Sequence, residues 1–378
     1  MQKGYVFKHG RNWYLRYRDN FEVDGKIVRK QTCVMLAKYD ANRYRTESDL
    51  ADLAAEKLAG VRQASKCPHS ADSFTSYVED EYLPYVLRSM KASTYSGYRT
   101  YWERYLRPRV GKYALRDFTV AIVAALLKDI ACKHKLNTET VKKIRSILSG
   151  VFTYAMSAGD FPARSEMDNP ASRARIPETA NEPKRTLAAS RETVQAILTA
   201  LQGHELERTA VAIIAYTGVR PGEARGLRWE DWDRTRQQIE VKRSVWHTIV
   251  GTPKTEQSEK PVPVNPELRQ ILLDLSRSQG LPVNGYILAG HKGQPMNLDN
   301  LAKRTIRTVL EAKGLIFPGW YTLRRFFATE VRLHTDSETV SKALRNSKAV
   351  ADKHYIKPTE VLPDVRKAVN DAVSGLVN

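Results

Sequence analysis

Three side chains in the C-terminal half of the chain have types that together can perform phosphoryl transfer. Arg220 lies between an apolar segment that ends at Gly218 and a helix start at Pro221, Arg324 lies in a predicted helix, and Tyr355 stands alone farther along. A guanidinium at a helix junction is poorly placed for core packing and well placed to reach an anion. Two arginines can hold one phosphate while a phenol attacks it.

The chemistry explains why these residue types would be needed. A phosphodiester carries one negative charge, and attack on phosphorus adds charge to its oxygens, so charge stabilisation is the main electrostatic task. We assign Arg220 and Arg324 to that task and Tyr355 to nucleophilic attack. Taken singly, a tyrosine is usually structural and an arginine at a helix end usually forms an ion pair. Only their joint occurrence favours catalysis.

The composition points to a polyanionic partner. The 378 residues include 61 Lys and Arg against 42 Asp and Glu, a formal net charge of +19, and so basic a protein is drawn to nucleic acid. A basic protein without that role is the alternative. The three scattered cysteines argue against a disulfide framework, and their neighbouring histidines are too sparse to predict a zinc site. We expect no metal and no cofactor.

Nothing in the sequence indicates export or a membrane. Met1 leads directly into charged sequence, and the longest apolar stretch, residues 120–127, is far too short to cross a bilayer. We therefore expect a cytoplasmic protein associated with DNA.

We predict a multidomain α+β fold in which residues 1–66 form a small basic domain. Its predicted elements are three strands at 5–9, 13–18 and 26–34, a hairpin turn at Asp24-Gly25 and a helix over 48–63. Such a sheet can place strands in a major groove, and Arg11, Arg16 and Arg18 are its candidate DNA contacts. A solvated edge sheet whose basic residues discourage aggregation is the alternative.

Residues 71–178 are predicted to form an all-helical domain. The apolar residues of its last helix fall on one face, and Asn137 or Thr138 can cap its start. An earlier helix carries a stripe of aromatic residues from Tyr95 to Tyr105, which we interpret as core. Arg99 and Arg104 on that helix are candidate DNA contacts. The proline-rich segment 159–185 is interpreted as an interdomain connector.

Residues 180–378 are predicted to be mainly helical with a small antiparallel sheet. The predicted elements are a helix from Ser190, strands at 239–245, 246–250 and 260–264, and helices from Pro266, near Asn300 and onward to the end. A capping box at residues 335–338 begins one of the later helices.

Four segments of this last domain resemble the catalytic domain of the tyrosine recombinases, the phage integrase family. Thr217–Glu223 is similar to the family's Thr-Gly-x-Arg-x-x-Glu segment, and Lys254 to its lysine in a β-turn. Tyr321–Arg324 resembles the His-x-Leu-Arg box, and Leu344–Ser347 resembles Leu-Gly-His-Ser, with Tyr355 at the matching distance. Order and spacing agree over roughly residues 190–360. The helical domain resembles the family's core-site-binding domain, and residues 1–66 resemble an arm-site-binding domain.

The resemblance implies a site-specific DNA recombinase that acts through a 3′-phosphotyrosine and needs neither ATP nor a metal. Lys254 would protonate the leaving 5′-oxygen, with Lys260 as runner-up. Asn346 would hold a non-bridging oxygen, and Glu223 would support the arginines. The rejoined bond equals the broken one in energy.

Two departures from the family pattern affect proton transfer. Tyr321 stands where the box has histidine, and Asn346 stands where the second histidine is expected. Each keeps a hydrogen-bonding group, but a phenol is a poor base at neutral pH. His354 adjoins Tyr355 in sequence, but helix neighbours point about 100° apart. The general base is therefore left open.

The expected partners are double-stranded DNA attachment sites of a phage or mobile element, a homotetramer on DNA, and accessory DNA-bending or directionality proteins. The tail from Pro358 to Asn378 would hold a helix that docks on a neighbour. Three alternatives stay open: a DNA-binding protein of this fold with weakened catalysis, a type IB topoisomerase, and an RNA-binding or structural protein.

Overall fold

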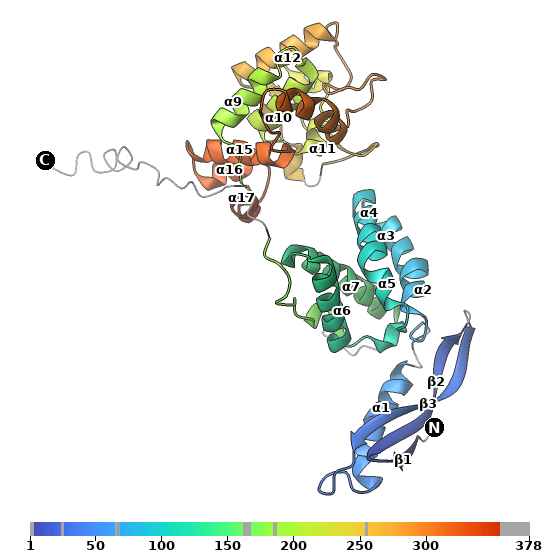
Figure 1. The fold of residues 1–378 in the computed structure, drawn as a ribbon. Helices are drawn as coiled ribbons and strands as arrows, with labels where there is room; N and C mark the ends of the chain where they lie inside the picture. The colour runs from blue at the N-terminus through green and yellow to red at the C-terminus, as the bar shows by residue number, and fades with distance from the viewer. Residues whose placement is uncertain are drawn as a thin grey trace, which may run out of the picture. The chain divides into compact units, whose positions relative to one another are not determined.

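The computed structural model describes residues 4–23, 26–64, 67, 69–161, 168–183, 187–253 and 256–355. The chain divides into two compact units, Met1–Lys184 and Arg185–Asn378, coloured blue to green and green to red in Figure 1. The predicted turn at residues 24–25, Lys254 and the predicted docking helix at 358–378 lie outside the described residues. A further division of the first unit near residues 66–71 stays a prediction.

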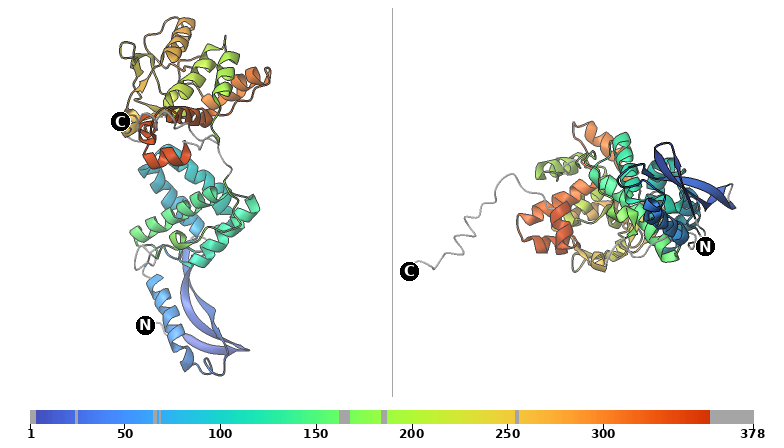
Figure 2. Two further views of the ribbon diagram at one scale, coloured as in Figure 1. Left: turned by 90° about the vertical axis from the view of Figure 1, so that its left-hand side faces the viewer. Right: turned by 90° about the horizontal axis from the view of Figure 1, so that it is seen from below.

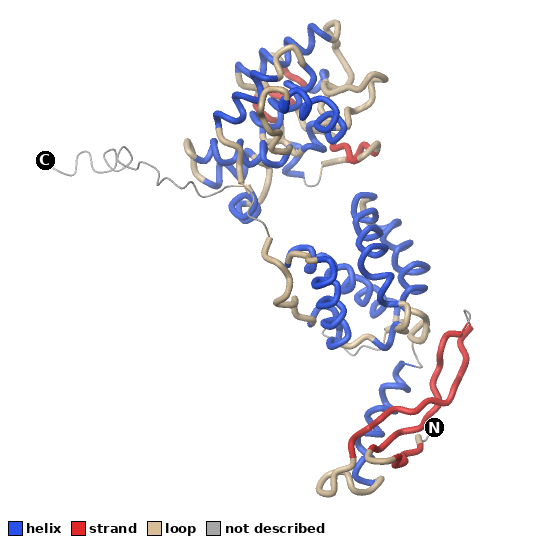
Figure 3. The backbone as a smooth tube through the Cα atoms, in the orientation of Figure 1, coloured by secondary structure: helices blue, strands red, loops and turns tan. Residues whose placement is uncertain are grey.

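The first unit begins with a three-stranded antiparallel sheet, drawn in red in Figure 3. Its strands are β1 (Tyr5–His9), β2 (Asn12–Val23) and β3 (Lys26–Lys38), in that order. The strands predicted at 13–18 and 26–34 were too short, because one ladder of backbone hydrogen bonds continues from Asn12↔Lys38 to Val23↔Lys26 through polar residues. Backbone pairing does not require apolar side chains.

A helix, α1 (Ala51–Ala64), lies along one face of this sheet in the views of Figures 1 and 2. On that face Trp13 and Leu15 of β2 are buried. Because side chains alternate along a strand, Arg16 and Arg18 point to the opposite face, where both are exposed. The guanidinium of Arg16 lies 4.7 Å from the centre of the Phe7 ring.

The rest of the first unit is helical. Its elements are α2 (Phe74–Ser76), η2 (Tyr77–Tyr82), α3 (Leu83–Ser89), α4 (Ala92–Tyr101), η3 (Trp102–Leu106), α5 (Arg107–Val110), η4 (Leu115–Asp117), α6 (Val120–His134), α7 (Thr138–Ala158) and α8 (Pro170–Arg173). The predicted face of α7 is confirmed: its buried residues are Val141, Ile144, Ile147, Leu148, Val151, Phe152 and Ala155, and the Asn137 side chain caps the helix.

The aromatic stripe of α4 and η3 is only partly interior. Trp102 and Tyr105 are buried, whereas the tyrosines of α4 are half-buried against the core. Arg99 and Arg104 are exposed. Arg99 forms an ion pair with Glu103 at 2.7 Å, so a phosphate would have to compete with this carboxylate.

The second unit packs its helices around one apolar core. They are α9 (Arg191–Ala200), α10 (Glu205–Thr217), α11 (Pro221–Ala224), α12 (Pro266–Ser278), α13 (Leu298–Leu301), η8 (Ala302–Ile306), α14 (Arg307–Glu311), α15 (Trp320–Arg332), α16 (Ser337–Ala343) and α17 (Lys348–His354). α10 is the central element, because eight of its residues are buried and it contacts both α12 and α15. A smaller cluster, centred on Ala328 and Leu344, joins α15, α16 and α17.

The strands of the second unit are shorter than predicted. β4 (Trp232–Asp233), β5 (Gln238–Ile239) and β8 (Val262–Pro263) form one sheet, and β6 (Ser244–Trp246) pairs with β7 (Ile249–Gly251) in another. The strand predicted at 239–245 is two separate strands. The strand predicted at 246–250 is a hairpin, which turns at His247 with a positive φ of 51°.

Candidate functional site

Arg220 occupies the junction that the sequence predicts. α10 ends at Gly218, whose φ of 63° is left-handed, and Arg220 is the residue before α11, which begins at Pro221. Both backbone features suit their residues, since glycine tolerates positive φ and proline favours the first helical position. The helices are therefore separated by only a few residues, and the Arg220 side chain is about one-fifth exposed.

A buried carboxylate fixes this arginine. Glu223 is 1% exposed. One of its oxygens accepts a hydrogen bond from Arg220 Nη1 at 2.7 Å, and the other accepts from the Arg220 backbone N–H at 3.0 Å. Ser258 and Asn346 also accept bonds from the guanidinium, Ser258 at 3.0 Å. Glu223 thus lies where the support predicted for it would be needed.

Arg324 of α15 is held differently. Its side chain is fully buried, with Nη1 donating to the carbonyl of Gly218 and Nη2 to the carbonyl of Leu344 at 3.0 Å. Burial lowers its pKa to about 10, with nearby Arg220 also lowering it and Tyr355 and Glu223 opposing. The group is still charged at neutral pH, and its Nε has no partner among the described residues.

Tyr355 follows α17 and lies against Arg324. The Arg324 guanidinium is 4.6 Å from the centre of the Tyr355 ring, an attractive geometry between a cation and an aromatic face. The ring also packs on the small apolar cluster of α15–α17. Helices α15, α16 and α17 therefore bring Tyr355 to the arginines, although it is more than a hundred residues from Arg220 in sequence.

The two positions where histidine was expected also belong to this site. Asn346 bonds Arg220 through Oδ1. Tyr321, in the first turn of α15, is half-exposed. Burial of its inner part raises the pKa of Tyr321, and the neighbouring Tyr355 raises it further. A phenol with a raised pKa stays protonated at neutral pH, so Tyr321 is not suited to act as a base.

Arg345 is a residue of this site that the sequence reasoning missed. It is 3% exposed, and its Nη2 donates to Glu223 at 2.8 Å, so one carboxylate serves two guanidinium groups. Its φ of 56° is left-handed, as suits the glycine of the Leu-Gly-His-Ser pattern. Arginine in place of that glycine was the available signal. Ser258 was also missed, and no sequence pattern marks it.

Other predicted groups are not placed at the site. Lys254 and the side chain of His354 lie outside what the structure describes. Lys260 is exposed and lines a pocket together with Arg345 and Asn346. Arg11, Arg16, Arg18, Arg99 and Arg104 belong to the first unit and stay predicted DNA contacts.

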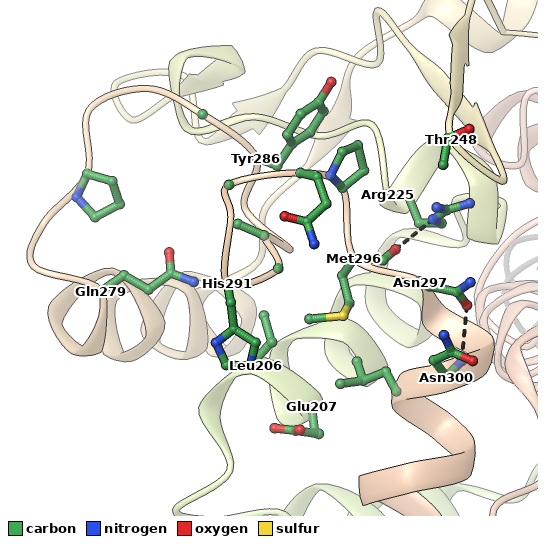
Figure 4. A pocket seen from close by; sticks show the side chains of 18 of the residues that line it. Leu206, Glu207, Arg225, Thr248, Gln279, Tyr286, His291, Met296, Asn297 and Asn300 are labelled. Atoms are coloured by element: carbon green, nitrogen blue, oxygen red, sulfur yellow. Dashed lines mark hydrogen bonds between the residues drawn. The ribbon is translucent and has the colours of Figure 1, made fainter.

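A larger hollow of about 910 Å³ lies elsewhere on the second unit. Figure 4 shows Arg225 directed at the Met296 carbonyl, to which it donates at 2.6 Å, and Asn297 beside Asn300, whose backbone N–H it accepts at 3.0 Å. Arg225 also donates to the carbonyls of Val245 and His247. Arg225 thus holds the surrounding loops and Asn297 caps α13, so both side chains are already engaged in the fold.

Within the described part of the chain, no three or more His, Cys, Asp or Glu side chains are grouped to hold a metal ion. The described helices include none that is long and apolar enough to span a membrane.

Comparison with known proteins agrees with this geometry. Residues 188–359 match the family model of the phage integrase family, a range that contains every residue of the site. Over this range the chain is similar to the phage integrase family of tyrosine recombinases. A tyrosine recombinase XerC-like protein of Caldanaerobacter subterraneus subsp. tengcongensis is 23% identical over 380 residues, covering 90% of each chain.

Two solved integrase structures share the fold. The Tn1549 transposon integrase, in complex with transposon right end DNA, covers 78% of this chain and 98% of its own, with a TM-score of 0.62 and 16% identity. A lambda integrase dimer bound to a core site covers 94% and 97%, with a TM-score of 0.59 and 18% identity. At these identities the likeness shows the fold alone. The family match and the XerC-like relative support a site-specific DNA recombinase.

Proposed function

We propose that this recombinase cleaves and rejoins DNA through a 3′-phosphotyrosine on Tyr355, with Arg220 and Arg324 holding the phosphate. The observation that carries the proposal is that Arg324 contacts both the segment next to Arg220 and the ring of Tyr355. It donates to the Gly218 carbonyl, two residues before Arg220, and lies 4.6 Å from the Tyr355 ring. A phosphate between the two guanidiniums would lie within reach of the phenol.

The atoms balance in this reaction. The Tyr355 oxygen bonds to phosphorus as its proton passes to solvent water, and the bond from phosphorus to the 5′-oxygen breaks. The 5′-oxygen leaves as a hydroxyl after it gains a proton, for which Lys254 is the proposed donor. Attack by a 5′-hydroxyl on the phosphotyrosine reverses these steps. One ester is exchanged for another, so no energy source is needed.

The guanidinium groups supply the electrostatic part. Arg220 and Arg345 share Glu223 as a carboxylate partner, and the guanidinium of Arg324 bonds two backbone carbonyls. This leaves an excess of positive charge in a mostly buried site. Charge that develops on the phosphate oxygens during attack is stabilised by such pre-placed donors. Asn346 would contribute its amide to a non-bridging oxygen.

The proposed partners are double-stranded attachment sites at the ends of a phage or mobile element. We propose a homotetramer on paired sites in the cytoplasm, with DNA-bending or directionality proteins as accessories. The basic face of the first unit, with Arg16 and Arg18 exposed, supports a role as an extra DNA anchor.

The test uses nicked duplexes tiled across the DNA that flanks the gene. In such a duplex the short cleaved fragment diffuses away and traps the covalent intermediate. We expect wild-type protein to form an adduct that survives denaturing electrophoresis on one duplex, and Tyr355→Phe to form none. Tyr216→Phe, at a half-buried tyrosine in α10, is the matched control and should retain the adduct.

The other outcomes are equally informative. Specific binding without any wild-type adduct would instead favour the DNA-binding protein with weakened catalysis, to which the absent imidazoles at Tyr321 and Asn346 point. Relaxation of a supercoiled plasmid that lacks the site would favour a topoisomerase.

A further inference from the structure

A basic pocket adjoins the proposed phosphate site. It has a volume of about 380 Å³, and we name it the Arg345 pocket. The charged and amide residues that line it are Lys260, Glu338, Lys342, Arg345, Asn346 and Lys348. Four cations therefore face one carboxylate, and Lys342 engages that carboxylate, Glu338, at 2.8 Å. The pocket is suited to an anion.

The strongest indication is an incompletely bonded arginine. The Arg345 side chain is 1% exposed and uses Nη2 for Glu223. Its Nε and Nη1 are buried and have no hydrogen-bond partner among the described residues, and the same holds for Nδ2 of Asn346. A buried donor without a partner is unfavourable, and a buried charge more so. An anion in the Arg345 pocket would satisfy the two arginine donors and one of the two N–H groups of Asn346, which leaves the other for the cleaved phosphate.

The backbone at this position also needs an explanation. Arg345 has a left-handed φ of 56°, which is unfavourable for a residue with a side chain and free of penalty for glycine. Glycine would therefore suit the turn between α16 and α17 better than arginine does. An arginine at such a place is explained if its guanidinium has a ligand.

We propose that the Arg345 pocket is a second phosphate site, which takes the DNA phosphodiester next to the one that is cut. This rests on the proposed function. Asn346 links the two sites, because its Oδ1 bonds Arg220 while its Nδ2 is unpartnered beside the Arg345 pocket. Successive phosphates of a strand rise only about 3.4 Å along the axis, so neighbouring phosphates can occupy sites one side chain apart.

The experiment neutralises DNA phosphates one at a time. Duplexes carry a single methylphosphonate at each position flanking the cleaved bond, and both adduct formation and equilibrium binding are measured. For wild type we expect one adjacent position at which neutralisation weakens binding about tenfold, as for loss of a charged hydrogen bond. In Lys348→Ala and in Arg345→Gly, neutralising that phosphate should weaken binding no more than neutralising its neighbours does.

Lys348 is exposed, so Lys348→Ala should leave the fold intact and is the deciding variant. Arg345→Gly introduces the residue that the backbone prefers but also breaks the buried pair with Glu223, so its thermal midpoint is measured alongside binding. Lys292→Ala removes an exposed lysine that does not line the Arg345 pocket, and it should keep the wild-type pattern. An equal response of all variants to every methylphosphonate would overturn the proposal. Absence of any wild-type adduct would count against the proposed function, while the binding data would still decide the second phosphate site.

A second measurement separates DNA from free anion. Inorganic phosphate should raise the thermal midpoint of wild type more than that of Lys348→Ala, with Lys292→Ala like wild type. Suppose that this difference appears but no methylphosphonate position responds differently in Lys348→Ala and Arg345→Gly. The pocket then binds free phosphate, and the assignment to DNA is wrong.

Discussion

The two arginines that we propose hold the phosphate are anchored in opposite ways. Arg220 is fixed by a buried carboxylate and stays about one-fifth exposed. Arg324 is fully buried, and the partners of its guanidinium are two backbone carbonyls. Carbonyls orient a guanidinium without neutralising it, whereas Glu223 does both. The side of the site built on Arg324 therefore carries the less compensated charge.

The difference has an energetic consequence. An uncompensated buried charge is costly, which is why the pKa of Arg324 falls to about 10, and a phosphate would relieve that cost on binding. Arg220 gains less from the phosphate, because it already has an ionic partner. We therefore expect Arg324 to contribute more to phosphate binding and Arg220 to depend more on its neighbours.

The largest expected effect is that of Arg324→Lys. An ammonium cannot reach both the Gly218 and Leu344 carbonyls and also bind a phosphate, because its three donors diverge from one point. We expect adduct formation to fall by about 10³ or more. Arg220→Lys should lose less, since Glu223 remains to orient the ammonium. Single-turnover rates on a nicked duplex measure both, and equal losses would remove the distinction between the two arginines.

Next in size is the effect of Glu223→Gln on stability. The change leaves the Arg220 and Arg345 guanidiniums without their carboxylate, and breaking a buried ion pair from one side costs about 3–5 kcal/mol. Urea unfolding of the intact protein measures it. Glu338→Gln, at an exposed carboxylate paired with Lys342, is the control and should leave the midpoint unchanged. A similar unfolding midpoint for both variants would show that the ion pairs of Glu223 do not stabilise the protein.

Some features of the fold and the site were predictable from the sequence and others were not. The Arg220 junction was predictable, because glycine and proline mark helix ends locally. The buried face of α7 was predictable from its 3.6-residue spacing. The strands around His247 were not, since two- or three-residue strands leave too little alternation to detect.

Apart from Glu223, the groups around the arginines were not predictable from local pattern. Ser258 meets Arg220 across 38 residues and Arg345 meets Glu223 across 122. Such contacts are set by how α16 and η7 (Glu256–Glu259) pack, on which local spacing carries no information. Motif resemblance found the residues at the centre of the site together with Glu223, and it missed Ser258 and Arg345.

A smaller effect is expected for Gly218→Ala, which tests the carbonyl anchor. At a φ of 63° an L-residue is strained, and the added methyl would collide with the Phe327 ring. We expect a stability loss of about 1–2 kcal/mol and slower adduct formation, because the carbonyl that Arg324 uses must shift. Gly203→Ala, with a φ of 84° and open space around it, carries the strain without the collision. If both variants cleave at the same reduced rate, the carbonyl is not important for Arg324.

The smallest effect is expected for Tyr321→Phe, which tests whether the exposed rim of the site transfers protons. The pKa of Tyr321 is raised above its ordinary value near 10 by burial and by Tyr355, so its hydroxyl stays protonated throughout the range from pH 6 to 9. Removing it should change the rate of adduct formation by no more than about threefold, as for one neutral hydrogen bond, and leave the pH profile unshifted. Tyr321→His would place an imidazole there. The rate of adduct formation should then rise with pH around the ordinary imidazole pKa of about 6.5, because the neutral imidazole can accept a proton. A shifted profile for Tyr321→Phe would mean that the phenol itself takes the proton, and that the two arginines alone do not account for the chemistry.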